Sequence, residues 1–194
     1  MVSLDQIKQL REETGVSISE CKKALEQAGG NFEKAKELLR KWGKEVAVKK
    51  MTRTSEQGII ESYIHPNKKV GVLLDIRCES DFVARSEDFR TLAHEICLQI
   101  AAMSPLFLRD EDIPEEFVDG EKKIYKEQTK DSGKPEKIIE QIVEGKLKKY
   151  KEQVSLMSQV WIKDDSKTIK DLIDGYIAKI GENIVVKKFS RYEI

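Results

Sequence analysis

The sequence predicts an α+β protein in which a bundle of three short helices precedes an antiparallel sheet that is covered by helices and followed by a helical-hairpin arm. Three observations lead to this class. Apolar residues recur with helical spacing through residues 3–42, alternate with a period of two from Gly58 onwards, and return to helical spacing at residues 87–103. A last alternating segment near the C-terminus provides a further strand for the sheet.

Composition excludes several classes of function. The chain has 194 residues, enough for one or two domains, with 35 Lys and Arg against 35 Asp and Glu. This balance argues against a general nucleic-acid or membrane binder. No apolar run approaches the ~18–20 residues that span a bilayer, and the N-terminus lacks the apolar core of a signal peptide.

The small numbers of cysteines and histidines exclude further classes of function. Cys21, Cys78 and Cys97 form no C-x-x-C pair, so we expect reduced thiols and a cytoplasmic protein. All three fall on expected core faces and are interpreted as small apolar residues rather than nucleophiles. Two histidines leave little material for a metal site, and we expect no metal and no cofactor.

Residues 1–43 are predicted to form a three-helix module. Its helices should begin after the N-caps Ser3, Ser17 and Asn31, the first two in capping-box patterns. Glycines are expected to end the helices, at Gly15, Gly29-Gly30 and Gly43. The apolar stripes comprise Leu4, Ile7 and Leu10, then Ile18, Cys21, Leu25 and Ala28, then Phe32, Ala35, Leu38, Leu39 and Trp42.

Residues 44–57 form a polar, basic segment that contains Lys49, Lys50 and Arg53. We interpret it as a linker or helix extension that tethers the first module to the next. The alternative is that its basic residues contact a partner.

Residues 58–113 are predicted to be a hairpin plus a covering helix. Strand-like alternation runs from Gly58 to Ile64 and from Val70 to Cys78, with a turn at 65–68 between them. A hairpin alone is marginally stable and needs a cover. The wide apolar stripe of residues 87–103, N-capped by Ser86, provides it. Between strand and helix, a short loop presents Asp81 beside Phe82.

Residues 114–153 are predicted to be an arm of two charged helices, the first opening at Pro114 and running to Lys130, the second running from Glu136 to Glu152. The break between them is Ser132-Gly133-Lys134-Pro135. Residues 154–194 should complete the core with a helix over 168–180 and a strand over 184–189.

Several motifs in this order resemble the elongation factor Ts family, and the similarity extends over nearly the whole chain. They are Leu10-Arg11-Glu12-Glu13-Thr14-Gly15, Glu20-Cys21-Lys22-Lys23-Ala24-Leu25, Ala28-Gly29-Gly30-Asn31, Ser80-Asp81-Phe82-Val83-Ala84-Arg85, Ser132-Gly133-Lys134-Pro135, Glu144-Gly145-Lys146-Leu147-Lys148-Lys149-Tyr150 and Ile180-Gly181-Glu182-Asn183-Ile184. The resemblance implies that the N-terminal bundle is similar in fold to ubiquitin-associated domains.

The resemblance also implies a function, that of a guanine-nucleotide exchange factor for the GTPase elongation factor Tu. In that family the pair that matches Asp81 and Phe82 reaches into the GTPase domain and disturbs its magnesium and phosphate site. Arg11, Ile18 and His65 match further partner contacts. Where the family often has Met, this chain has Ser19, so apolar contact is weaker there.

The residues alone leave alternatives to these assignments. Phe82 could be a core side chain, because isolated aromatic residues are usually buried, although it lies outside both the strand and the helix pattern. His65 could be only a turn residue.

Longer family members carry a duplicated core and a further C-terminal helix. Only one hairpin-plus-helix unit is visible here, and short members dimerise through their sheets, so the resemblance implies a homodimer that engages two partner molecules. Because no cysteine follows Cys97, no disulfide near the C-terminus can link it.

The sequence contains no constellation of covalent catalysis. It has no G-x-x-x-x-G-K-[ST] loop, no H-E-x-x-H and no G-x-S-x-G, so an enzyme is the least favoured class and nucleotide binding by the chain itself is not expected. The second candidate function is a non-catalytic adaptor whose ubiquitin-associated-like bundle recruits a helix or peptide. We expect no direct binding of nucleic acid or membrane.

Overall fold

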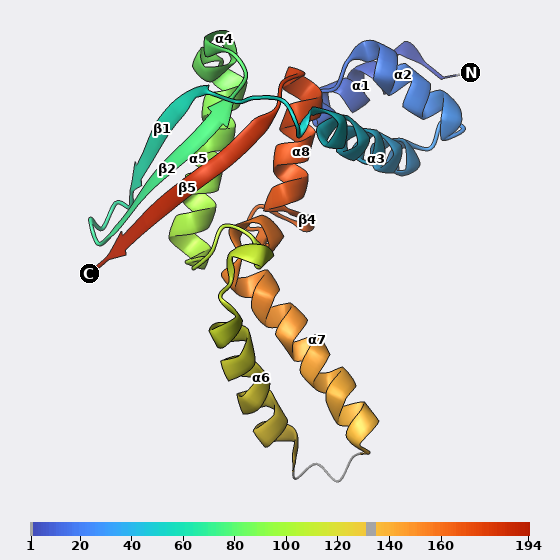
Figure 1. Cartoon of the computed structure of the whole chain (residues 1–194). Coiled ribbons are helices and arrows are strands. Elements are labelled where there is room, and N and C mark those ends of the chain that lie inside the picture. Colours follow the sequence, from blue (N-terminus) through green and yellow to red (C-terminus); the bar gives the residue numbers. More distant parts are fainter. Residues whose placement is uncertain (1, 131–134) are drawn as a thin grey trace. The chain divides into compact units, whose positions relative to one another are not determined.

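The computed structural model describes residues 2–130 and 135–194, and it has the predicted α+β architecture (Figure 1). Its α-helices are α1 Leu4–Thr14, α2 Ile18–Gln27, α3 Phe32–Lys50, α4 Asp81–Arg85, α5 Glu87–Met103, α6 Glu115–Lys130, α7 Glu136–Val154 and α8 Ile169–Ile180. Its strands are β1 Gln57–Ile64, β2 Val70–Cys78, β3 Val160–Trp161, β4 Asp164–Thr168 and β5 Ile184–Glu193. Single 3-10 turns are η1 Asp110–Asp112 and η2 Leu156–Ser158.

The chain divides into two compact units, which are described separately. The first unit comprises residues 1–61, 74–95 and 171–187, and the second comprises residues 62–73, 96–170 and 188–194. The first therefore holds the N-terminal helices, α4 and most of α8, and the second holds α6, α7 and the β3–β4 pair.

In the first unit, α1, α2 and α3 form the predicted bundle. Ser3 and Gln6 make a reciprocal capping box, and Ser17 and Asn31 cap the next two helices. Their buried apolar residues form one cluster, which consists of Ile7, Leu10, Cys21, Ala24, Leu25, Ala35 and Leu39. Three predictions were wrong here, and they concern Leu4, Ile18 and Gly43. Leu4, the first residue of α1, was expected in the apolar stripe but is 74% exposed.

Ile18 was expected in the apolar stripe but is exposed, because the first turn of α2 lies at the edge of the bundle. Gly43 does not end α3, which continues to Lys50. The helix passes α8 at this point: a Cβ placed on Gly43 would lie 3.5 Å from the Cβ of Ala178, an ordinary van der Waals contact, so the packing does not require glycine. Lys44, beyond that glycine, forms an ion pair of 2.6 Å with Asp171 of α8.

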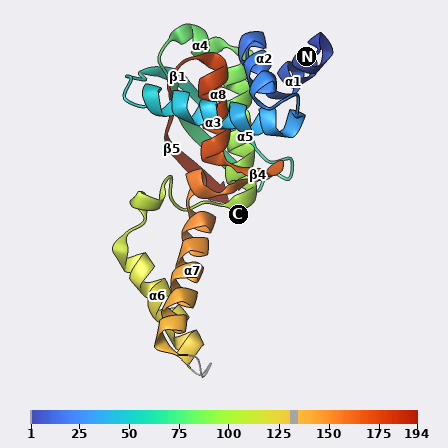
Figure 2. The same ribbon diagram turned by 90° about the vertical axis from the view of Figure 1, so that its right-hand side faces the viewer.

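The main sheet has the order β1-β2-β5. Along β2, Val72, Leu74, Ile76 and Cys78 are buried while Leu73 is half-exposed, so one face of the sheet is covered and the other is open. Helix α5 lies against the covered face (Figures 1 and 2) and carries the predicted stripe, which includes the fully buried Phe89, Leu92, Ala93, Ile96, Cys97 and Ile100. Strand β5 extends to Glu193, beyond the predicted end, because its charged residues hide the alternation.

In the second unit, α6 and α7 lie side by side as the predicted arm (Figure 2). The predicted break at 132–135 lies mostly outside the described residues. The small antiparallel β3–β4 pair was not predicted, since its five-residue strand DDSKT has no apolar alternation. Two buried glutamines fasten this region: Gln99 Nε2 donates to Gln159 Oε1 at 3.1 Å and to the Val160 carbonyl at 3.0 Å.

Among the described residues, no helix is long and apolar enough to cross a membrane.

Candidate protein-binding site

The stretch between β2 and α5 forms a short helix, α4, rather than the predicted loop. Ser80 is its N-cap, and the Ser80 hydroxyl accepts a hydrogen bond from the Val83 amide at 3.3 Å. At the other end, the Ser86 amide donates to the Val83 carbonyl at 2.9 Å. The Ser86 hydroxyl also accepts from the Phe89 amide at 3.3 Å, so it caps α5 as predicted. Two serines thus define both ends of α4.

Phe82 projects from α4 into solvent and is 83% exposed. The alternative that Phe82 is a core residue is therefore excluded. Ala84, two positions later, is buried and faces the protein instead. Asp81 forms an i,i+4 ion pair with Arg85 at 3.1 Å, and because both side chains are largely exposed this pair contributes little stability.

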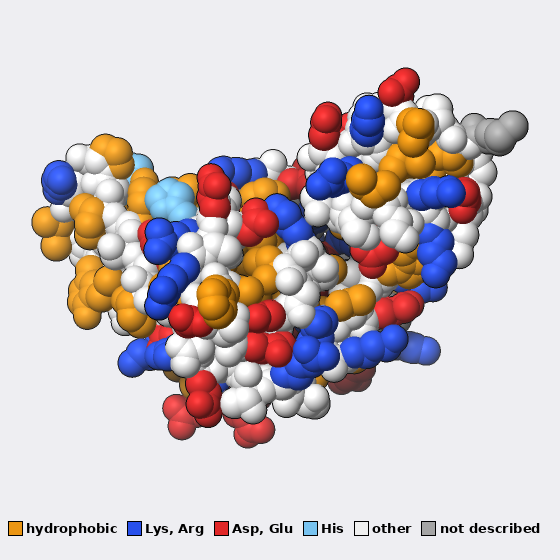
Figure 3. Space-filling model, turned by 90° about the horizontal axis from the view of Figure 1, so that it is seen from above, with side chains coloured by type: hydrophobic (Ala, Val, Ile, Leu, Met, Phe, Trp, Pro, Cys, Tyr) orange, Lys and Arg blue, Asp and Glu red, His pale blue; other side chains and the backbone are white. Residues whose placement is uncertain are grey.

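The face of the molecule that carries α4 is chemically mixed (Figure 3). Charged side chains of both signs lie between smaller groups of hydrophobic ones.

The other predicted site residues lie elsewhere in the fold. Arg11 is exposed near the end of α1, and Ile18 is 53% exposed at the start of α2, both in the first unit with α4. Ser19, beside Ile18, is also exposed.

His65 lies in the β1–β2 turn of the second unit, where its amide donates to the Val70 carbonyl at 2.9 Å. Its Nδ1 lies 3.0 Å from the Tyr63 hydroxyl, and the two rings meet edge to face. His65 is therefore a turn residue with an exposed side chain, which leaves the predicted partner contact a prediction.

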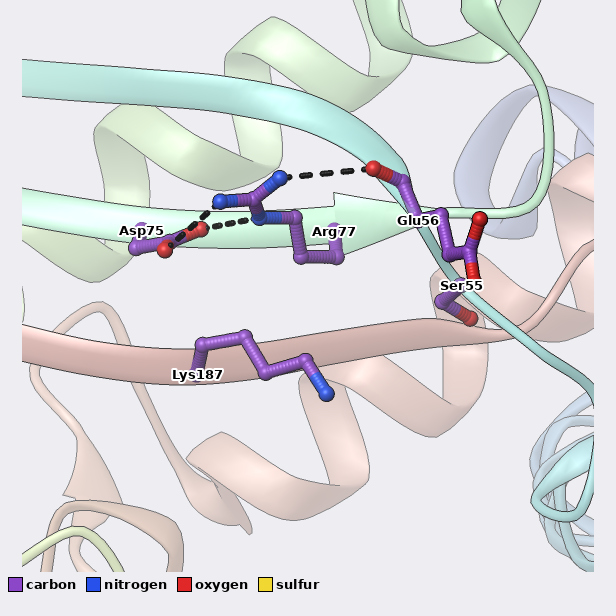
Figure 4. A pocket seen from close by; sticks show the side chains of 5 residues that line it. All are labelled: Ser55, Glu56, Asp75, Arg77 and Lys187. Carbon is purple, nitrogen blue, oxygen red and sulfur yellow. Dashed lines mark hydrogen bonds and ion pairs between the residues drawn. The ribbon is translucent and has the colours of Figure 1, made fainter.

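A recess of about 430 Å³ lies on the open face of the sheet in the first unit, and none of the predicted site residues lines it (Figure 4). It is lined by Ser55, Glu56, Asp75, Arg77 and Lys187. Arg77 Nη2 donates to Asp75 Oδ2 at 2.9 Å, and Nη1 donates to the Glu56 carbonyl at 3.3 Å. The Asp75 carboxylate raises the pKa of the Arg77 guanidinium. The charges of its two acidic and two basic side chains compensate each other.

The cysteines are buried, as predicted. Burial raises the pKa of the Cys78 thiol to about 11, with a further contribution from the negative charge of Glu182. The protonated thiol donates to the Ser80 carbonyl at 3.2 Å. Burial likewise raises the pKa of Cys21. Both thiols are therefore poor nucleophiles.

Within the described residues, no group of three His, Cys, Asp or Glu side chains is arranged to hold a metal ion. The site instead presents a strongly exposed aromatic side chain, Phe82, on a capped helical turn. Such a geometry is typical of proteins that act by binding another macromolecule, because exposed aromatic residues are frequent anchors of protein interfaces.

Comparison with known proteins identifies the family. The family model described as Elongation factor TS matches residues 5–194. The chain is 56% identical over 193 residues to Elongation factor Ts of Thermotoga petrophila, with 100% of this chain and 96% of the relative covered. It is 51% identical to Elongation factor Ts of Coprothermobacter proteolyticus and 50% identical to that of Thermosipho melanesiensis, covering 98% and 99% of those chains. The chain therefore belongs to the elongation factor Ts family, and its role is in translation elongation.

Proposed function

We propose that this protein is a guanine-nucleotide exchange factor that binds elongation factor Tu and promotes the release of GDP. Phe82 enters the GTPase domain, with Asp81 beside it, and disturbs the magnesium and phosphate site. The observation that carries this proposal is the 83% exposure of Phe82 on a helix whose two ends are capped. The action needs no covalent chemistry, and a cytoplasmic location follows from the role in translation.

The energetics of exchange require more than one side chain. An exchange factor must bind the nucleotide-free partner better than the GDP-bound partner, and by linkage GDP weakens its own binding to the same degree. A shift of about 10⁴-fold takes about 5.5 kcal/mol of differential affinity. Burying one aromatic side chain contributes about 1.5–3 kcal/mol. Contacts at Arg11, Ile18 and His65 supply part of the remainder in this proposal.

Release of labelled GDP from elongation factor Tu tests the assignment of Phe82. We expect Phe82→Ala to lower the stimulated release rate by about ten- to a hundredfold, as the lost burial implies. Phe117→Ala is the control, because Phe117 is a half-exposed phenylalanine on α6 with no role in the proposed site. A folded Phe82→Ala protein with wild-type activity would refute the assignment.

Measuring the complex with elongation factor Tu in the presence and absence of GDP and magnesium separates exchange from simple recruitment by the ubiquitin-associated-like bundle. A complex formed by an exchange factor is weakened by GDP and magnesium, since nucleotide and factor compete through the same equilibrium. A complex formed by an adaptor is indifferent to both. Indifference would therefore favour the adaptor function.

We also propose a homodimer that uses the open face of the sheet and engages two partner molecules. In the second unit this face exposes Ile64, Leu73, Tyr192 and Ile194, at 57%, 49%, 70% and 93%. Adjacent apolar side chains in solvent are typical of an interaction surface. Light scattering at micromolar concentration should give twice the 22.3 kDa of one chain. A monomeric mass contradicts the proposal.

A further inference from the structure

The turn between α8 and β5 holds the backbone that leads into α4. Glu182 Oε2 accepts hydrogen bonds from the amides of Glu79 at 3.1 Å and Ser80 at 2.9 Å. Its second oxygen, Oε1, accepts from the Ser80 hydroxyl at 2.6 Å. One carboxylate thus satisfies three donors immediately before α4. Bonds of this kind, with a charged acceptor, are among the stronger hydrogen bonds in proteins.

The attachment is reciprocal, which fixes the two segments to each other at several points. Glu79 Oε1 accepts from the Asn183 amide at 2.7 Å, and Asn183, which is buried, donates from Nδ2 to the Arg53 carbonyl at 2.9 Å. The Lys50 ammonium donates to the Gly181 carbonyl. All of these residues belong to the first unit.

The backbone of Gly181 makes this arrangement possible. Its φ of +86° lies in the left-handed region, which favours glycine, and it turns the chain sharply at the end of α8. Glu182 follows directly and so points back toward the end of β2.

The Glu182 carboxylate also decides how the Ser80 hydroxyl is used. A hydroxyl has one hydrogen, and here that hydrogen is donated to Glu182 Oε1. The oxygen lone pairs are then left to accept the Val83 amide, which is the N-cap bond of α4. Phe82 lies between these two residues and is exposed, so this capped backbone sets the direction of its Cα–Cβ bond.

We infer that Glu182 is a positioning residue, which orients Phe82 for action on the partner by fixing Glu79 and Ser80 at the start of α4. This inference rests on the proposed exchange function and adds to it a residue outside the predicted contact set. A side chain that is held in its working direction before binding loses less conformational entropy when the complex forms. Glu182 therefore acts on exchange through Phe82.

A double-mutant cycle tests the inference with labelled GDP release at saturating factor. We expect Glu182→Ala to lower the stimulated rate about tenfold when Phe82 is present, and less than twofold in the Phe82→Ala background. The reason is that a positioning residue has no effect once the residue it positions is gone. Equal losses in both backgrounds, or no loss in either, would overturn the inference.

Two further variants show whether a loss in Glu182→Ala comes from misfolding. Glu182→Gln keeps the shape and one acceptor oxygen for the backbone amides, and we expect a loss of about threefold, between those of wild type and Glu182→Ala. Asp164→Ala is the matched control, because Asp164 accepts from the Ser166 amide at 3.1 Å and from the Ser166 hydroxyl at 2.6 Å in the β3–β4 pair. This control should release GDP at the wild-type rate.

Amide hydrogen exchange measured by NMR separates this inference from the proposed function. The Val83 amide should be protected in the wild-type protein and exchange faster in Glu182→Ala, whether or not GDP release is stimulated. If wild-type protein fails to accelerate GDP release, the proposed function is wrong, whereas unchanged protection of Val83 in Glu182→Ala shows that Glu182 does not position α4.

Discussion

Helix α4 and the arm made by α6 and α7 are both exposed parts of the molecule, but they are stabilised in different ways. The helix α4 has five residues, far fewer than an isolated helix needs in water. The arm helices have 16 and 19 residues. Helix α4 therefore exists because its neighbours hold it, whereas the arm helices are favoured by their own sequence.

The bonds around each region show this difference. The backbone amides just before α4 donate to Glu182, which is distant in the sequence. The Val83 amide within α4 donates to Ser80, the N-cap. In the arm, the buried Thr129 donates its hydroxyl back to carbonyls of its own helix, and Val143 is buried on α7. Burial raises the pKa of Tyr125 and Tyr150 on the two helices, with the charge of Glu121 adding to the effect. The segment of α4 that carries the exposed Phe82 is therefore held by hydrogen bonds to its backbone rather than by apolar burial.

The largest predicted effect on stability comes from replacing a glycine by alanine, compared between β1 in the first unit and the arm in the second. A Cβ at Gly58, in the first unit, would lie 2.2 Å from the Ile76 carbonyl oxygen and 2.8 Å from the Arg77 Cα. Because both atoms belong to the backbone, Gly58→Ala must separate β1 from β2, and we expect a loss of about 3 kcal/mol or more in the free energy of unfolding. Urea denaturation measures it.

The matched control for Gly58→Ala is Gly145→Ala in α7, where a Cβ would meet nothing within 4 Å. Alanine favours a helix interior over glycine, so this variant should gain about 0.5–1 kcal/mol. A loss in Gly58→Ala together with a gain in Gly145→Ala would sharpen the comparison. A loss of stability in Gly145→Ala would show that the arm, too, depends on contacts outside its own sequence.

A smaller effect is expected from removing one hydroxyl in each region. Ser80→Ala removes the N-cap of α4 and the donor to Glu182, and it should cost about 1–2 kcal/mol. Thr129→Val removes a hydroxyl that donates to carbonyls of its own helix and keeps the shape of the side chain, so we expect a smaller loss than for Ser80→Ala, below about 1 kcal/mol. Thermal unfolding followed by circular dichroism measures both. Equal losses would contradict the proposed difference between α4 and the arm.

The smallest effect concerns pH. Hydrogen bonds from Lys167 and Ser166 lower the pKa of Asp164 to about 2. Because the folded pKa lies below the unfolded value of about 3.9, this group adds stability above pH 4 and loses it as the pH falls toward 2. The side chain is partly exposed, so the contribution should be below about 1 kcal/mol. Asp164→Asn should therefore be less stable than wild type at pH 7 and equal to it near pH 2, and a constant difference would contradict this assignment.

The sequence by itself determined the elements whose signals are local. The caps at Ser3, Ser17 and Asn31 place the helices of the bundle because each cap bonds to residues within the same turn. The stripe of α5 and the alternation of β2 mark buried faces through periods that depend only on backbone geometry. The motif around Phe82 pointed to the candidate site.

The tertiary structure alone decided what depends on distant neighbours. Helix α4, the passage of α3 through Gly43 and the exposure of Ile18 each follow from packing that the local pattern does not contain. The bonds from Glu182 join residues 102 and 103 positions apart. A glutamate after a glycine carries no local sign of such a role, because the three donors that it satisfies are brought to it only when β2, α8 and β5 fold together.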